Sequence, residues 1–170
     1  MKKPDKLRKP LKVKLDYVSV LLDTVNERVK AAGSEIYERE CGVNVRQMRV
    51  LRAAAHEPGM TRARLIEHVH LEKTLASKTV TELVRRGLMS RTVGATDARQ
   101  VCLELTDEGE AIVLQAEPIG RRLEATARGL LGAQRYDTLI GCLQQLAQFG
   151  EDASADVERH LKRSASRRRG

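Results

Sequence analysis

Apolar residues recur at alternating spacings of four and three in the N-terminal part of the chain, after a basic, proline-containing arm at residues 1–10. This repeat predicts a helix over residues 11–40 with one continuous apolar seam. A seam of more than three heptads is buried better against partner helices than against a small domain, so the pattern indicates an oligomerisation helix. A helix packed only within its own subunit is the alternative. The seam consists of Leu11, Leu15, Val18, Leu22, Val25, Val29, Ala32 and Ile36.

The middle of the chain predicts three short helices followed by a β-hairpin. Asn44 is placed to cap a helix that runs to about His56, and Thr61 is placed to cap a shorter one. A third helix runs from about residue 73 to 86, where Gly87 permits a left-handed C-terminal residue. Two alternating segments, 89–93 and 101–105, then predict strands joined by a loop with an exposed tip.

Two further helices are expected at residues 107–149. Thr106 is placed to begin a long helix, which Pro118 should bend, and a final amphipathic helix carries Tyr136, Leu139 and Leu146. The polar, basic tail at 150–170 is expected to be frayed. The predicted fold is therefore mainly α with a small β-hairpin wing, in which N- and C-terminal dimerisation helices flank a winged helix-turn-helix core at 44–106.

The amino-acid composition agrees with a helical fold, and the net charge indicates the kind of partner that the protein binds. Among the 170 residues, 41% are hydrophobic but only 2% are aromatic, which suits a helical core of aliphatic side chains. The formal net charge is +8, and the pI is about 9.7. Such a balance favours a polyanionic partner, with nucleic acid first, although basic residues that merely solvate the surface would give the same total.

The third helix of the core carries the chemistry expected of a helix in the major groove. Short polar side chains let backbone and base edges approach closely, and cations meet the phosphates. No carboxylate lies between Lys73 and Thr81, which argues against an ordinary solvated face. The predicted DNA-contacting strip consists of Lys73, Thr74, Ser77, Lys78, Thr81 and Arg85.

The hairpin loop offers a second contact. Arg99 could enter a narrow minor groove, and the nearby carboxylate of Asp97 could orient its guanidinium. A plain surface salt bridge between the two is the alternative.

The run from Asn44 to Gly109 resembles the DNA-binding core of the MarR family. The resemblance is strongest in the wing, where Arg91, a further candidate DNA contact, is followed by Asp97-Ala98-Arg99, then by Leu105-Thr106 and Gly109. Lys78 and Ala98 depart from the family pattern, where arginine is frequent. The other matching residues are Gln47, Val50, Leu51, Thr61, Leu65, Leu71-Glu72-Lys73-Thr74, Ser77, Leu83 and Gly87-Leu88.

This resemblance implies a cytoplasmic homodimer that binds double-stranded DNA at a pseudo-palindromic operator and responds to a small molecule. The expected function is that of a transcriptional repressor released by an aromatic carboxylate or phenol. The family places the effector cavity under the first helix, beside the second and the start of the fifth. Candidate lining residues, each more often explained by packing or surface exposure, are Tyr17, Tyr37, Arg46, Met48 and His56.

The sequence contains few features of other function classes. There is no nucleophile with a base, no paired catalytic carboxylates and no phosphate-binding glycine loop, so neither an enzyme nor a cofactor is expected. His68 and His70 point apart on a helix, which disfavours a shared metal ion. No stretch resembles a signal peptide or a membrane span.

Three separated cysteines, Cys41, Cys102 and Cys142, predict neither disulfides nor a zinc site. An inert thiol is the preferred interpretation for Cys41. A redox- or metal-sensing regulator and a winged-helix scaffold for protein partners remain alternative functions.

Overall fold

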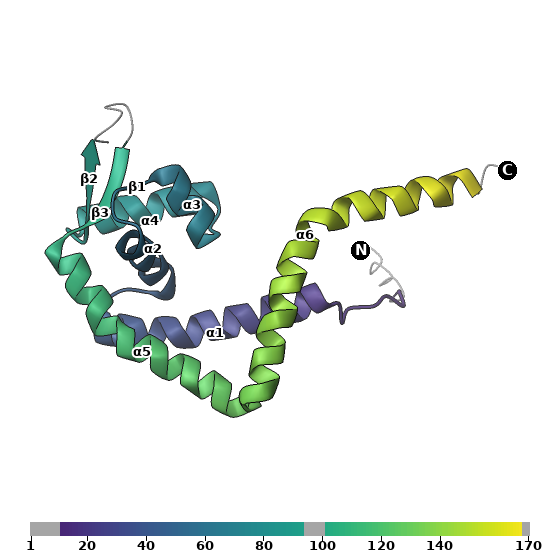
Figure 1. Cartoon of the computed structure of the whole chain (residues 1–170), viewed down its shortest axis with the longest axis horizontal. Helices are drawn as coiled ribbons and strands as arrows, with labels where there is room; N and C mark the ends of the chain where they lie inside the picture. The colour runs from purple at the N-terminus through teal and green to yellow at the C-terminus, as the bar shows by residue number, and fades with distance from the viewer. Residues whose placement is uncertain (1–10, 94–100, 168–170) are drawn as a thin grey trace, which may run out of the picture. The chain divides into compact units, whose positions relative to one another are not determined.

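The structure, a computed structural model, describes residues 11–93 and 101–167 (Figure 1). The chain divides into two compact units, with the boundary between Pro118 and Ile119. The first unit holds the predicted core together with the N-terminal helix and the first half of the long helix. The second holds the remainder of that helix and the C-terminal helix. Mainly helical structure with one small antiparallel sheet confirms the predicted fold class.

Helix α1 spans Val18–Cys41 and therefore begins seven residues later than the heptad pattern predicts. Leu11 and Leu15 lie before it, without regular structure. The physical reason is a competing period of two, since apolar residues at 11, 13, 15 and 17 alternate with Lys12, Lys14 and Asp16, and such alternation does not give a helix one apolar face. At the other end, Gly42 adopts a φ of 67° and ends the helix.

Helix α2, Val45–His56, starts with a reciprocal cap. The Asn44 side chain accepts a hydrogen bond from the Gln47 amide, and the Gln47 side chain accepts one from the Asn44 amide, both at 2.9 Å. Helix α1 packs closely against α2 at Gly33, which has no side chain. A Cβ at this position would lie 2.9 Å from Val45 Cγ2.

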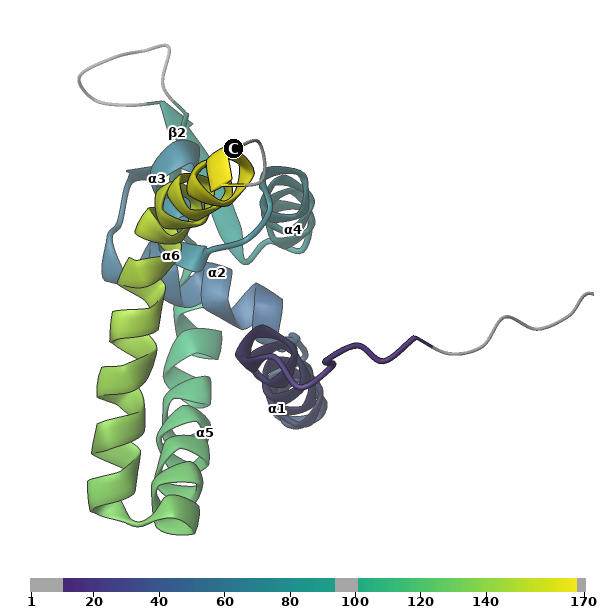
Figure 2. The same ribbon diagram turned by 90° about the vertical axis from the view of Figure 1, so that its right-hand side faces the viewer.

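Helices α3, Arg62–Val69, and α4, Lys73–Arg85, complete the helix-turn-helix. Thr61 caps α3 as predicted, accepting a hydrogen bond from the Arg64 amide. The turn between the two helices places His70 in the left-handed region at a φ of 48°. Figure 2 shows α3, α4 and the strand β2 close together, with α2 below them. Their shared core includes the fully buried side chains of Met48, Leu51, Leu65, Leu83, Met89 and Leu103.

The predicted hairpin is confirmed as β2, Met89–Val93, and β3, Val101–Leu105. A third strand, β1 at Met60–Thr61, pairs antiparallel with β3 and gives the order β1-β3-β2. The sequence did not predict β1, because two residues carry no readable period. It ties the start of α3 to the wing.

Helix α5, Asp107–Leu131, is joined to the core by residues before Pro118. Arg52 of α2 donates a hydrogen bond to the Ala116 carbonyl at 3.2 Å and lies 3.7 Å from the Glu117 carboxylate. Gln115 donates to the Glu40 carbonyl at 2.7 Å. Contacts to α1 and α2 thus fix the first half of α5 within the first unit.

Helix α6, Ala133–Arg167, extends well beyond the predicted end at residue 149, so the expectation of a frayed tail from 150 is wrong for residues 150–167. This stretch contains three alanines and three arginines and holds no proline, and alanine and arginine favour helix even without a continuing apolar seam. Within the second unit, Arg128 of α5 binds Asp137 of α6 through two hydrogen bonds, at 2.7 and 3.1 Å.

Candidate DNA-binding surface

Helix α4 presents a polar, mostly cationic face, and Glu72 fixes its N-terminus. The Glu72 carboxylate accepts hydrogen bonds from the Thr74 and Leu75 amides, each at 3.0 Å. These bonds, with that from the Thr74 amide first, lower the pKa of Glu72. The first turn of α4 is therefore well formed at neutral pH, which holds the side chains next to it at the leading end of the helix.

The predicted strip lies on the outer side of α4. Lys73, Thr74, Lys78, Thr81 and Arg85 are exposed, and Ser77 is half-buried. The inner side is formed by Ala76, Thr79, Val80 and Leu83, all buried. Thr79 was not predicted to be inside, and its hydroxyl is satisfied by donating to the Leu75 carbonyl at 2.9 Å.

The one carboxylate in the second half of α4, Glu82, is engaged by the core. Gln47 donates a hydrogen bond to it at 2.9 Å. Arg86, which follows α4, donates to the Gly42 carbonyl at 2.8 Å and lies 3.4 Å from the Gln47 side-chain oxygen. These bonds hold the end of α4 against the turn between α1 and α2.

A recess of about 280 Å³ separates α4 from the wing. Arg91 of β2 donates a hydrogen bond across it to the Thr81 hydroxyl at 3.0 Å. Arg62, the first residue of α3, also lines the recess, together with Ser77. Sequence reasoning missed Arg62 because its place beside the wing depends on the pairing of β1 with β3.

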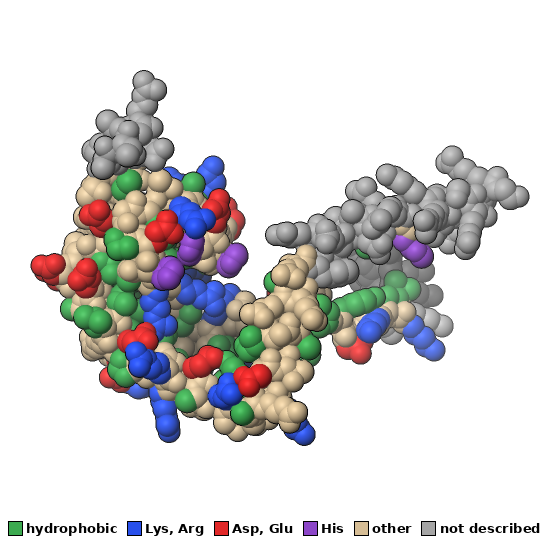
Figure 3. Space-filling view, viewed as in Figure 1, with side chains coloured by type: hydrophobic (Ala, Val, Ile, Leu, Met, Phe, Trp, Pro, Cys, Tyr) green, Lys and Arg blue, Asp and Glu red, His purple; other side chains and the backbone are tan. Residues whose placement is uncertain are grey.

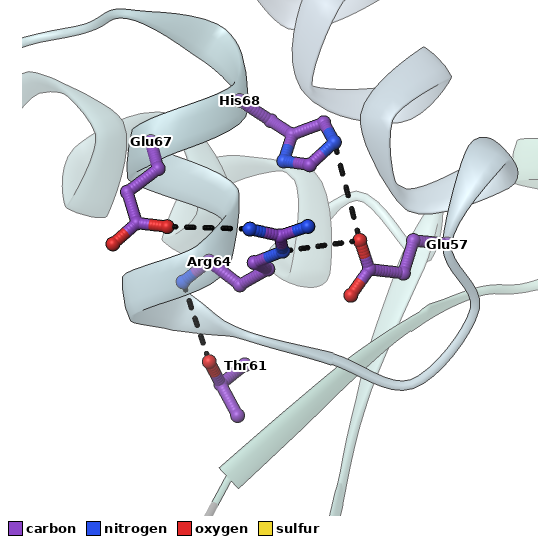
Figure 4. A network of polar contacts seen from close by, with 5 residues as sticks. All are labelled: Glu57, Thr61, Arg64, Glu67 and His68. Atoms are coloured by element: carbon purple, nitrogen blue, oxygen red, sulfur yellow. Dashed lines mark hydrogen bonds and ion pairs between the residues drawn. The ribbon is translucent and has the colours of Figure 1, made fainter.

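Figure 4 shows the ion pairs of Arg64, which lies two residues after Arg62 on α3. Arg64 lies 3.3 Å from Glu57 and 3.6 Å from Glu67, so both carboxylates neutralise it. His68 Nε2 lies 3.9 Å from the same Glu57 oxygen. Arg62 makes no hydrogen bond or ion pair with the described residues, which leaves its charge available to a partner.

Asp97 and Arg99, the predicted wing contacts, lie outside the described residues. Their roles therefore stay predictions, as does that of Ala98.

The five candidate effector residues lie in different surroundings, and their role stays a prediction. Tyr37 and Met48 are buried in the core, while Tyr17 is exposed at the N-terminal cap of α1. His56 is exposed at the end of α2, with its ring centroid 6.3 Å from that of His68. Arg46 is exposed near the start of α2, where it lines a cavity against α1.

Histidines gather with acidic and basic side chains on the face formed by α2 and α3, as Figure 3 shows. Despite this grouping, no set of three or more His, Cys, Asp or Glu residues within the described part of the chain lies close enough to hold a metal ion. No helix within the same ranges is long and apolar enough to cross a membrane.

The thiols differ in their surroundings. Cys41 is buried at the end of α1, and burial, assisted by the charge of Glu40, raises its pKa, with Arg52 acting weakly in the opposite direction. Cys102 is half-buried in β3, and Cys142 is exposed in α6. A protonated, buried thiol is a poor nucleophile.

Three helices followed by a hairpin, with the third helix exposed beside the wing, define a winged helix-turn-helix domain of the DNA-binding class. A sequence model of the MarR family matches residues 42–100. Transcriptional regulator HosA of Escherichia coli O157:H7 is 31% identical over 100 residues, which are 59% of this chain and 74% of HosA. The chain therefore belongs to the MarR family of DNA-binding transcriptional regulators.

Solved structures share the fold. A MarR/EmrR family transcriptional regulator from Acinetobacter sp. ADP1 gives a TM-score of 0.73 at 16% identity, over 79% of this chain and 94% of that one. The transcriptional repressor CouR, solved with a 23-mer DNA duplex, gives a TM-score of 0.69 at 24% identity, over 78% of this chain and 93% of CouR. BpsR of Bordetella bronchiseptica, whose DNA binding is regulated by 6-hydroxynicotinic acid, gives a TM-score of 0.63 at 16% identity, over 75% of this chain and 98% of BpsR.

Proposed function

We propose that the chain is a homodimeric repressor that places α4 in the major groove of each half of a pseudo-palindromic operator. The observation that carries this proposal is the outer face of α4. It combines Lys73, Lys78 and Arg85 with short hydroxyl side chains and holds no carboxylate before Glu82, which Gln47 engages. Thr74, Ser77 and Lys78 would read base edges, and Lys73, Thr81 and Arg85 would meet the flanking phosphates.

The recess between α4 and the wing supports this orientation. When a helix occupies the major groove and a wing enters the adjacent minor groove, one sugar-phosphate strand must run between them. Arg62 and Arg91 line the space through which that strand would pass. They would bind phosphates and set the register, while Arg99, with Asp97 beside it, would contact the minor groove.

The exposed apolar seam of α1 supports a homodimer. Val18, Leu22, Val25 and Val29 are 38–66% exposed in the single chain, although they repeat at heptad spacing. Contiguous apolar surface of this kind marks an association site, and its self-complementary seam fits a second copy of the chain. The second unit has exposed apolar residues of its own, Leu130, Leu139, Ile140 and Leu146, which a partner copy could also cover.

Control by a small aromatic carboxylate or phenol completes the proposal. BpsR supports this class, because the compound that regulates its DNA binding is itself an aromatic acid. Such a ligand releases DNA only to the extent that it prefers the arrangement of the two copies that does not fit the operator.

Selection of duplexes from a random pool tests this function. We expect a symmetric site with half-sites about one helical turn apart, bound by two chains per duplex in analytical ultracentrifugation. Its affinity should fall steeply with salt concentration. A protein-interaction scaffold on the same fold would enrich no sequence. A redox sensor would lose specific binding on mild oxidation, and a metal sensor would lose it with chelator.

A further inference from the structure

Glu82 is the acidic side chain of α4, and it lies among the residues that the proposed function assigns to DNA. It lines a groove on the surface of α4 together with Ser77, Lys78, Thr81 and Arg85. Lys78 lies four residues before Glu82 and Arg85 lies three residues after it. Side chains at both spacings are neighbours on a helix, so a free carboxylate at this position is within reach of both cations.

A buried side chain of the core holds the Glu82 carboxylate. Gln47 is only 5% exposed, and its side-chain nitrogen donates a hydrogen bond to Glu82 Oε1 at 2.9 Å. Among the described residues, Glu82 forms no ion pair with Lys78 or Arg85, although all three line the same groove. Both cations are therefore left available to a partner.

The other bonds of Gln47 fix the orientation of its amide group. Its oxygen accepts a hydrogen bond from the Asn44 backbone amide at 2.9 Å and lies 3.4 Å from the Arg86 guanidinium. Both of these groups are donors, so the oxygen must face them and the NH₂ group must face Glu82. Arg86 in turn donates to the Gly42 carbonyl at 2.8 Å. The network therefore ties Glu82 to the turn between α1 and α2.

We propose that Gln47 is a positioning residue for DNA recognition, because its amide holds the Glu82 carboxylate away from Lys78 and Arg85. Without this bond, Glu82 would pair with the two cations and would repel the phosphates of the duplex. The role is separate from helix capping, since the cap uses the oxygen of Gln47 and the bond to Glu82 uses its nitrogen. This inference rests on the proposed function and deepens it by explaining how the face of α4 stays cationic.

A suppressor substitution separates this role from a purely structural one. Gln47→Met removes the cap and the bond to Glu82 together, so it should lower the unfolding midpoint and weaken binding to the selected duplex by about tenfold. The salt dependence should also become shallower, because a cation paired with Glu82 releases fewer counterions from DNA. Adding Glu82→Gln removes the competing charge. The double variant should regain DNA affinity to within about threefold of wild type, while its unfolding midpoint stays low because the Asn44 cap is still incomplete.

Two further variants complete the test, which uses fluorescence anisotropy for DNA binding and chemical denaturation for stability. Glu110→Gln is the matched control, because it removes the same charge from an exposed helical residue that lines a different cavity, and it should not restore binding to Gln47→Met. Gln47→Glu keeps the oxygen that caps α2 but has no hydrogen to donate to Glu82, so it tests the same role if Gln47→Met does not fold. Its loss of DNA affinity should also be recovered by Glu82→Gln.

The possible results distinguish this role from the wider function. If the selected duplex binds wild type but Glu82→Gln recovers no affinity in either Gln47 variant, the role of Gln47 is overturned and the proposed function stands. Equal recovery with Glu110→Gln would also overturn the role, since any lost negative charge would then suffice. A changed preference at one base pair in Glu82→Gln alone would make Glu82 itself a base contact and would overturn the inference. If wild type selects no duplex, the proposed function fails and the inference fails with it.

Discussion

Glu72 shows how a single carboxylate fixes the start of α4. Its bonds to the Thr74 and Leu75 amides require the charged form, so the folded-state pKa lies below the unfolded-state value. The stabilising contribution is therefore present above the unfolded-state pKa and is lost as pH falls through the lowered folded-state pKa. In an acid titration followed by NMR, the Thr74 and Leu75 amide signals should shift together, and Glu72→Gln should remove that shift. Amides that titrate unchanged in the Gln variant would contradict the cap.

Close packing requires glycine at position 109. A Cβ at this position would overlap the Leu88 carbonyl oxygen, which belongs to the backbone and cannot move aside alone. Gly109→Ala should destabilise the fold by about 1–3 kcal/mol in chemical denaturation, as overpacking does elsewhere. Glu108→Ala, on the exposed side of the same turn, should leave the unfolding midpoint nearly unchanged. Equal midpoints for the two variants would show that the close approach is not real.

At the scale of helices and strands, the residues that cap helices were predicted better from the sequence than the extent of the apolar heptad seam. Asn44, Thr61 and Gly87 mark element ends through local hydrogen bonds or backbone conformation, and the structure confirms each of these boundaries. The start of α1 was mispredicted because a heptad pattern cannot exclude a competing period of two. The recess beside α4 was also beyond prediction, since the place of Arg62 depends on a two-residue strand that pairs across 40 residues of sequence.

Helix α3 offers a matched pair of arginines for testing the phosphate contact. Arg62→Ala should reduce the slope of log K against log salt concentration by about one, because one phosphate contact and its released counterion are lost. Arg64→Ala should leave the slope unchanged, since Glu57 and Glu67 already neutralise that side chain. Fluorescence anisotropy of the selected duplex over a salt series measures both slopes. A larger change for Arg64 would place the DNA strand on the other side of α3.

At the scale of the whole molecule, association should depend on the seam of α1. Leu22→Glu and Val25→Glu place a charge on its exposed apolar stripe and should shift the chain from dimer to monomer in sedimentation velocity. Ser19→Glu introduces the same charge on the polar side of the helix and serves as the control. A dimer that persists in both seam variants would move the interface to the C-terminal helices.

The whole account depends on α4 reading base sequence, and Lys78→Ala tests that claim most directly. The measurement is the affinity of wild type and variant for the selected duplex and for each single-base-pair substitution within one half-site. We predict that the variant loses discrimination of about 1–3 kcal/mol at one base pair in each half-site and keeps its preferences elsewhere. A uniform loss of affinity across all duplexes, with every preference retained, would show that Lys78 contacts only the backbone and would contradict the base reading proposed for this residue of α4.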